Sequence, residues 1–101
     1  MILYYVTCKD KEESKRIAQE LLKKKIISCA NIMQSDSVYE WGGELKEHPE
    51  SILLVKTLNR TEEEVKDAIR ELSSYDLPAI IKVEGKINEE YLNWMEEKIK
   101  K

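Results

Sequence analysis

The segment Val38–Leu45, VYEWGGEL, places two large aromatic rings directly before a pair of glycines. Alternate residues of a β-strand point to the same face, so Tyr39 and Trp41 would share one face of a strand that ends here. Glycine tolerates the positive φ angles of tight turns, so we expect Gly42-Gly43 to form a turn or a bulge. The rings then belong to a core, to a binding pocket or to a surface that another chain covers.

The residues on both sides of the glycines favour a long hairpin. Upstream, IISCANIM is rich in β-branched and small apolar residues, which indicates a strand that starts near Ile27 and continues through QSDS to Trp41. Downstream, ELKEHPE is polar and contains Pro49, which cannot donate to a sheet ladder. We therefore expect an exposed hairpin end there, followed by a third strand from Ser51 to about Leu58.

The chain before the hairpin predicts a strand and a helix. Ile2–Val6 is an apolar run typical of a strand that is buried on both faces. Asp10 followed by Glu13 fits a capping box, in which each side chain accepts a hydrogen bond from a free amide of the first turn. The apolar residues that follow recur at helical spacing, namely Ile17, Ala18, Leu21, Leu22 and Ile26.

The chain after the hairpin predicts a second helix, a fourth strand and a last helix. Thr61 and Glu64 form another capping-box pattern before an apolar stripe of Val65, Ala68, Ile69 and Leu72. AIIKVEG, after Pro78, indicates the fourth strand. Asn88 is then expected to cap a helix with Leu92, Met95 and Ile99 on one face.

This order, βαββαβ plus a C-terminal helix, predicts an α+β fold of the ferredoxin-like type in a single domain, residues 1–101. Such a fold has an antiparallel sheet with its two crossover helices on one face. Strands such as ILYYV and SILLV carry apolar residues on both faces, so the other face also needs a cover. The sequence therefore predicts an oligomer.

Composition and charge exclude several classes of protein. Seventeen Lys and Arg stand against 20 Asp and Glu, the net charge is −3, and the basic residues form no stripe, which argues against a nucleic-acid partner. The N-terminal residues have neither a signal-peptide pattern nor a membrane span. We expect a cytoplasmic protein in which Cys8 and Cys29 stay reduced and form no structural disulfide.

No catalytic motif is present. The sequence has no Gly-rich phosphate loop, no HExxH and no CxxC, and His48 lies in a charged segment where a solvated side chain is expected. We therefore expect no enzymatic activity. One polar group remains, formed by Lys56, Thr57, Tyr75 and Asp76 with Trp41 nearby. It is either an ordinary solvated surface or a pocket between subunits that binds a small anion.

The segments CAN (29–31), YEWGG (39–43), KT (56–57), YDLPAI (75–80) and YLNWM (91–95) occur in an order that resembles the CutA divalent-cation tolerance proteins. The resemblance covers nearly the whole chain. It implies a compact homotrimer of ferredoxin-like subunits, similar in build to the PII signalling proteins and linked to tolerance of copper and other divalent cations. It implies no established reaction.

The same resemblance implies a sparse set of copper ligands. Some bacterial members have a proposed Cys in the first strand, the Cys of CAN, and His residues before the fourth strand. Only Cys29 matches here, because Val6, Leu72 and Ser73 occupy the other positions. Cys8 lies two residues beyond the first-strand position, hence on the same strand face, and could substitute. We expect at most weak binding of copper or another divalent cation, through Cys29 or Cys8.

The sequence thus supports a non-catalytic homotrimeric CutA-like protein of metal tolerance. Tyr39 and Trp41 are expected to be interface anchors at the end of a hairpin that pairs with another subunit, although two rings packed on their own hairpin remain an alternative. A PII-like regulatory trimer that binds a small anion or nucleotide between subunits is the alternative function.

Overall fold

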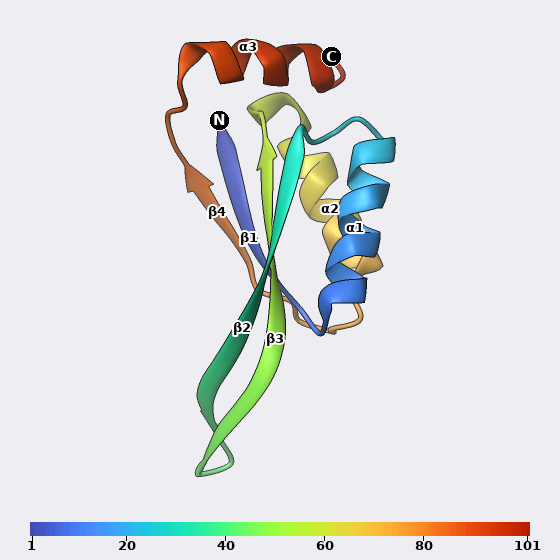
Figure 1. Ribbon diagram of the computed structural model, residues 1–101. Coiled ribbons are helices and arrows are strands. Elements are labelled where there is room, and N and C mark those ends of the chain that lie inside the picture. Colours follow the sequence, from blue (N-terminus) through green and yellow to red (C-terminus); the bar gives the residue numbers. More distant parts are fainter.

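A four-stranded antiparallel sheet in the order β2-β3-β1-β4 forms the centre of the computed structural model, which describes residues 1–101 (Figure 1). The strands are β1 (Ile2–Cys8), β2 (Cys29–Trp41), β3 (Glu44–Thr57) and β4 (Ile80–Glu84). The helices are α1 (Lys11–Lys23), α2 (Glu62–Leu72) and α3 (Glu89–Lys98), with a 3-10 turn, η1 (Asn59–Thr61), before α2. The predicted ferredoxin-like α+β fold with an added C-terminal helix is confirmed.

Helices α1 and α2 cover one face of the sheet and enclose the main core (Figure 1). Burial alternates along β1, because Ile2, Tyr4 and Val6 point toward the helices and are fully buried. Leu3 and Tyr5 point the other way and are only half-buried. The expectation that this strand is buried on both faces is therefore met on one face only within a single chain. No helix is both long and apolar enough to span a membrane.

The hairpin formed by β2 and β3 extends well beyond the other strands (Figure 1). Strand β2 has 13 residues and β3 has 14, whereas β1 has 7. Gly42 and Gly43 close the hairpin with φ angles of 60° and 79°, as a two-residue turn of type I′ requires. The predicted turn and the predicted long second strand are both confirmed.

The segment ELKEHPE is the exposed end of the hairpin, as expected, but the expectation that the third strand starts only at Ser51 is wrong. Strand β3 already begins at Glu44, and Pro49 lies opposite Asp36 of β2 in the ladder. The pairing of β1 with β3 ends at Ser51, so the residues before it have a strand neighbour on one side only. A strand with a neighbour on one side only has one free edge. Proline is tolerated in such a strand because its missing N–H costs no ladder hydrogen bond where it faces that edge.

Two of the three predicted helix caps are not formed. At α1 the Asp10 carboxylate accepts from the Glu13 amide at 2.9 Å, and the Glu13 carboxylate accepts from the Lys9 amide at 3.0 Å. These two bonds confirm the first capping box, except that the Glu13 carboxylate accepts from the amide of Lys9 and not from that of the cap residue Asp10. Thr61 and Asn88 make no side-chain cap, because Thr61 donates to the Ile26 carbonyl and Asn88 donates to the Glu90 carboxylate.

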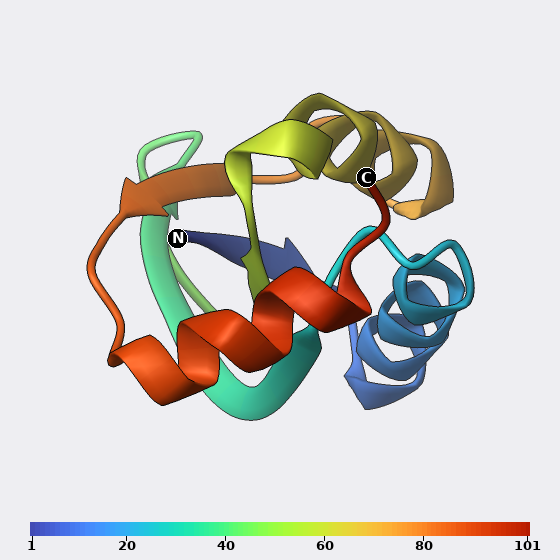
Figure 2. The same ribbon diagram turned by 90° about the horizontal axis from the view of Figure 1, so that it is seen from above.

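Helix α3 lies apart from the other two helices, across the end of the sheet where β1 begins and β3 ends (Figure 2). Met95 and Ile99 are buried on its inner side against Leu58, with Leu92 partly buried beside them. The predicted apolar stripe of the last helix is therefore confirmed for Leu92 and Met95, whereas Ile99 is buried just beyond the helix end at Lys98. This small cluster is separate from the main core under α1 and α2.

The end of α1 adopts a backbone shape that usually belongs to glycine. Lys25 has φ of 57°, and the amides of Lys25 and Ile26 donate to the carbonyls of Leu22 and Leu21, as in a Schellman motif. A side chain in this left-handed region is strained by about 1 kcal/mol. The Lys25 carbonyl accepts from the Lys100 amide at 2.8 Å, which ties the end of α1 to the residues after α3.

Lys25→Gly is expected to raise the free energy of unfolding by roughly 0.5–1 kcal/mol, because it removes the strain of the left-handed residue. Lys24→Gly is the matched control: Lys24 is right-handed with φ of −75°, so glycine there should lower stability. Urea denaturation of both variants measures the difference. A loss of stability in Lys25→Gly would contradict the assignment of strain.

Candidate functional site

The face of the sheet opposite α1 and α2 is the candidate functional surface, and it is called the open face below. Its apolar centre consists of side chains from all four strands: Leu3, Tyr5, Met33, Ile52, Leu54, Ile81 and Val83. Met33 is 48% exposed, Ile81 50% and Val83 47%. A single chain therefore leaves these three side chains about half exposed, whereas Ile52 between them is buried, with 3% exposed.

One end of the open face, under α3, carries the candidate metal-binding thiol. Cys29 on β2 lies directly opposite Lys56 on β3, and both side chains are half-buried. The Lys56 ammonium lies 5.4 Å from the centre of the Tyr91 ring of α3. Burial, and then the interaction with the Cys29 side chain, raises the pKa of the Tyr91 phenol. Cys29, Lys56 and Tyr91 thus form one local group at this end of the open face.

Cys8 and Cys29 do not share a site. Cys8 pairs with Ser51 and Cys29 with Lys56, positions that lie five residues apart on β3 and therefore on opposite faces. Cys8 is fully buried among the core residues beneath α1. Burial raises the pKa of its thiol, so the thiolate that a metal requires is disfavoured. The proposed substitution of Cys8 for a first-strand ligand is not supported by this placement.

A second polar group lies toward the hairpin, around Glu50. The Glu50 carboxylate accepts from the Tyr75 hydroxyl at 2.8 Å and from the Ser37 hydroxyl, and its side chain is only 11% exposed. Burial, followed by the hydrogen bond to Glu50, raises the pKa of Tyr75. His48 lies 3.9 Å from the same carboxylate and 3.2 Å from the Tyr39 hydroxyl. These residues link the base of the hairpin to the loop that follows α2.

His48 lies at the surface, as expected, but it also has specific partners. Its side chain is 42% exposed, but one ring nitrogen contacts Tyr39 and the other faces Glu50. The Tyr39 and His48 rings also meet edge to face, with centroids 5.4 Å apart. Tyr39 therefore packs partly on its own hairpin. Trp41 does not, since it is 73% exposed near the hairpin tip.

The predicted polar pocket is not assembled within one chain. Thr57 is fully buried on the helix side, where its hydroxyl lies 2.7 Å from the Ile26 carbonyl and 2.8 Å from the Thr61 hydroxyl. Lys56 points to the open face instead. Tyr75 contacts Glu50, six residues before Lys56, which is about 20 Å along a strand. Asp76 is exposed in the loop beyond Tyr75.

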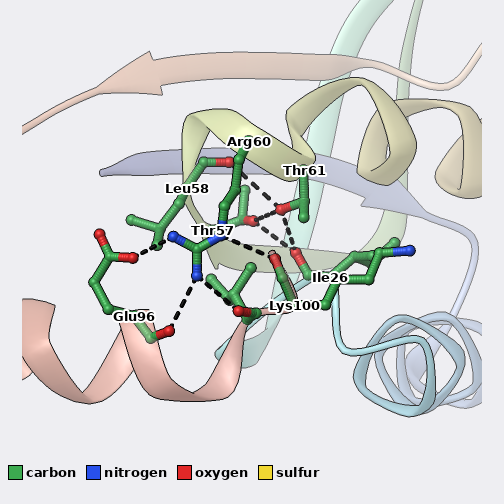
Figure 3. Close-up of polar contacts among 8 residues, drawn as sticks. Ile26, Thr57, Leu58, Arg60, Thr61, Glu96 and Lys100 are labelled. Atoms are coloured by element: carbon green, nitrogen blue, oxygen red, sulfur yellow. Dashed lines mark hydrogen bonds and ion pairs between the residues drawn. The ribbon is translucent and has the colours of Figure 1, made fainter.

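Arg60 forms a third polar group at the end of the sheet covered by α3 (Figure 3). Its guanidinium donates to the backbone carbonyls of Glu96, Ile99 and Lys100 at 3.0, 2.7 and 2.9 Å and pairs with the Glu96 carboxylate. The last carbonyls of a helix have no partner within the helix, so Arg60 satisfies acceptors that would otherwise need water or a cap.

Sequence reasoning missed Glu50, Tyr91 and Arg60. Glu50 and Arg60 sit in charged segments that look like solvated surface, and nothing local distinguishes a buried carboxylate from an exposed one. Their roles depend on partners 25 and 36 residues away in the chain. Tyr91 could have been noted, because it begins the YLNWM segment and precedes the buried Met95 by one helical turn.

Comparison with known proteins identifies relatives over the whole chain. The family model described as CutA1 divalent ion tolerance protein matches residues 2–98. The divalent-cation tolerance protein CutA of Pyrococcus horikoshii is 39% identical over 102 residues, which cover 100% of both chains. The Thermotoga maritima protein of the same name is 37% identical and covers 98% of this chain and 99% of its own.

Solved structures agree with the fold. The crystal structure of CutA1 from Pyrococcus horikoshii superposes with a TM-score of 0.94 at 39% identity, covering 100% of both chains. The Archaeoglobus fulgidus protein, described as a periplasmic divalent cation tolerance protein CutA, gives 0.92 at 32% identity, covering 99% of this chain and all of its own. A relative from Arabidopsis thaliana is described as chloroplastic. Because these relatives differ in compartment, the cytoplasmic location stays a prediction.

Glu13 provides a test of how the Tyr75 loop is held, because its carboxylate accepts from the Ser74 amide at 2.9 Å with a side chain only 1% exposed. Burial alone would raise its pKa, but the amides of Ser74 and Lys9 and the charge of Arg16 together hold the pKa below the usual 4.5. The stability that ionised Glu13 contributes to the fold is therefore fully present above pH 4.5, the usual pKa, and is lost as the pH falls through the lowered pKa.

Glu13→Gln is expected to cost about 2 kcal/mol of stability at pH 7 and to show a shallower loss of stability below pH ~4.5 than the parent chain. Urea denaturation between pH 3 and pH 7 measures both effects. Glu12→Gln, at an exposed neighbouring position, is the control and should follow the parent profile. Parallel pH profiles for Glu13→Gln and the parent would show that this carboxylate does not anchor the loop.

Proposed function

This chain belongs to the CutA1 divalent ion tolerance protein family, and on that premise we propose that it acts in metal tolerance as a non-catalytic homotrimer with weak copper binding at Cys29. The observation that carries the proposal is the open face. A sheet with helices on one side only, and with Met33, Ile81 and Val83 about half exposed on the other, requires a second covering surface.

The hairpin of β2 and β3 is the element that fits this requirement. It projects beyond the core, and its far end carries Val38, Trp41 and Leu45, which are 60%, 73% and 78% exposed. Hairpin and open face are two different surfaces of one chain, so each hairpin would pack on the face of a neighbour in a head-to-tail contact. Head-to-tail contacts form a ring when the rotation between subunits closes, and the resemblance noted in the sequence implies a ring of three.

Strand β2 also offers an unpaired edge. It lies at the end of the sheet order, and beyond Ser35 the hairpin is a two-stranded ribbon without helix cover. Exposed edges of this length are normally paired or blocked in stable proteins. Pairing with a neighbouring subunit satisfies the edge and places the aromatic ring of Trp41 in an apolar surrounding. Tyr39, already packed against His48, would contribute less.

The metal-binding part of the proposal rests on one thiol. Cys29 is the cysteine that reaches the open face, and the residues around it, Lys56 and Tyr91, are a cation and a phenol. Tight copper(I) sites combine several soft or imidazole ligands, so a single thiol supports only weak binding. The residues fit a low-affinity site better than a closed structural one.

The PII-like alternative is less favoured by the hairpin. A flexible loop between the second and third strands is needed for that function, whereas β2 and β3 are paired residue by residue up to Trp41 and Glu44. Only Gly42 and Gly43 lie between them. Lys56 and Tyr75, at opposite ends of the open face, could still approach one another across a subunit boundary.

Trp41→Ala is expected to weaken the trimer, because a large aromatic at the centre of a contact contributes several kcal/mol to association. At micromolar concentration we expect smaller species in sedimentation and a melting temperature that rises with protein concentration. Leu22→Ala is the control, since Leu22 is 45% exposed on α1, away from the open face. An intact trimer with concentration-independent melting in Trp41→Ala would exclude Trp41 as an anchor.

Copper binding is expected to depend on Cys29 and not on His48. Native mass spectrometry of the chain with added copper(I) should show partial loading, which Cys29→Ser abolishes and His48→Ala leaves unchanged. Cys8→Ser is a further control, because Cys8 is buried in the core. Loading that survives Cys29→Ser and disappears in His48→Ala would move the site to the Glu50 group.

A further inference from the structure

Helix α3 is joined to the rest of the chain by few and separable contacts. Its buried residues belong to a small cluster with Leu58, and none of them is part of the main core. The segment Gly85–Asn88, which precedes it, has no regular secondary structure. An element of this kind can detach as a unit while the sheet and the two core helices stay folded.

Polar contacts at the C-terminal end of α3 are the main restraint. Arg60 binds three backbone carbonyls and one carboxylate there, so four of its five N–H groups are used (Figure 3). Lys100 adds a backbone bond to Lys25 and a side-chain bond of 2.8 Å to Glu64. Arginine is suited to this role because its planar fork can hold several acceptors in fixed directions.

The opposite half of α3 covers the candidate thiol. The Tyr91 ring lies 5.4 Å from the ammonium of Lys56, the residue directly opposite Cys29, and it packs against the small cluster that docks the helix. Detachment of α3 would remove this ring and leave Cys29 at the open end of the sheet. The restraint at Arg60 and the cover at Tyr91 are therefore connected through one rigid helix.

We propose that residues Glu89–Lys100 form a strap that opens as a unit, that Arg60 is its latch, and that the strap controls access to the Cys29 thiol. The consequence for metal loading rests on the copper role proposed above. The proposed opening of the strap does not rest on the copper role, because alkylation of the Cys29 thiol reports the opening without any metal. A failed copper experiment and a failed strap experiment can therefore be told apart.

The test is the rate at which iodoacetamide alkylates Cys29 in the assembled protein, followed by peptide mass spectrometry. Arg60→Ala should raise the rate at least about tenfold, since losing even one charge-assisted hydrogen bond changes an opening equilibrium by about that factor. Arg60→Lys should also raise it, because it keeps the charge but loses the fork. Arg60→Lys also supplies the comparison if Arg60→Ala fails to fold.

Lys66→Ala is the matched control. Lys66 pairs with Glu63 on α2 and its side chain is 31% exposed, close to the 28% of Arg60, but it forms no hydrogen bond or ion pair with α3. We expect its alkylation rate to equal that of the parent chain. Hydrogen exchange should show faster exchange in residues 89–100 of Arg60→Ala while the amides of β1 keep their protection.

Three results would overturn the proposal. The first is an unchanged alkylation rate in both Arg60 variants. The second is loss of protection in β1 together with α3, which would mean global destabilisation. The third is an alkylation rate that varies with protein concentration, because access to Cys29 would then follow dissociation of subunits and not the strap.

Discussion

The structure depends on a sheet that has apolar side chains on both faces and helices on only one. Within the chain, α1 and α2 bury the side of β1 that carries Ile2, Tyr4 and Val6. The open face keeps Met33, Ile81 and Val83 in contact with water. In the assembly proposed above, another chain covers this face, and the projecting hairpin is the part of the molecule that would cover it.

Three charged side chains hold the irregular segments in place. Glu13 fixes the loop after α2 through the Ser74 amide, Glu50 fixes the same loop through the Tyr75 hydroxyl, and Arg60 fixes the end of α3 through backbone carbonyls. In each case a charged group forms hydrogen bonds to backbone or hydroxyl groups of the segment that it holds. Breaking one of these pairs removes a restraint on its segment, so a single substitution at Glu13, Glu50 or Arg60 should act mainly on the segment that it holds.

The candidate functional residues are divided between the two ends of the open face. Cys29, Lys56 and Tyr91 lie at the end covered by α3, while Glu50, Tyr75 and His48 lie toward the hairpin. The apolar centre between them belongs to the surface that a neighbour would cover. In the proposed assembly both ends border the surface that a neighbour covers, so a ligand or metal at either end would be sensitive to assembly.

The sequence by itself determined the order of elements, because periodicity, the Asp10 cap and the Gly42-Gly43 turn are local signals. It also indicated the uncovered face, since ILYYV and SILLV are apolar on both sides. Tertiary structure alone decided the rest. Pro49 lies within a strand, Thr57 is turned into the core, Cys8 and Cys29 are on opposite faces, and Arg60 reaches α3. Each of these facts depends on register or on a partner distant in the chain, and pairing across such distances leaves no mark in the neighbouring residues.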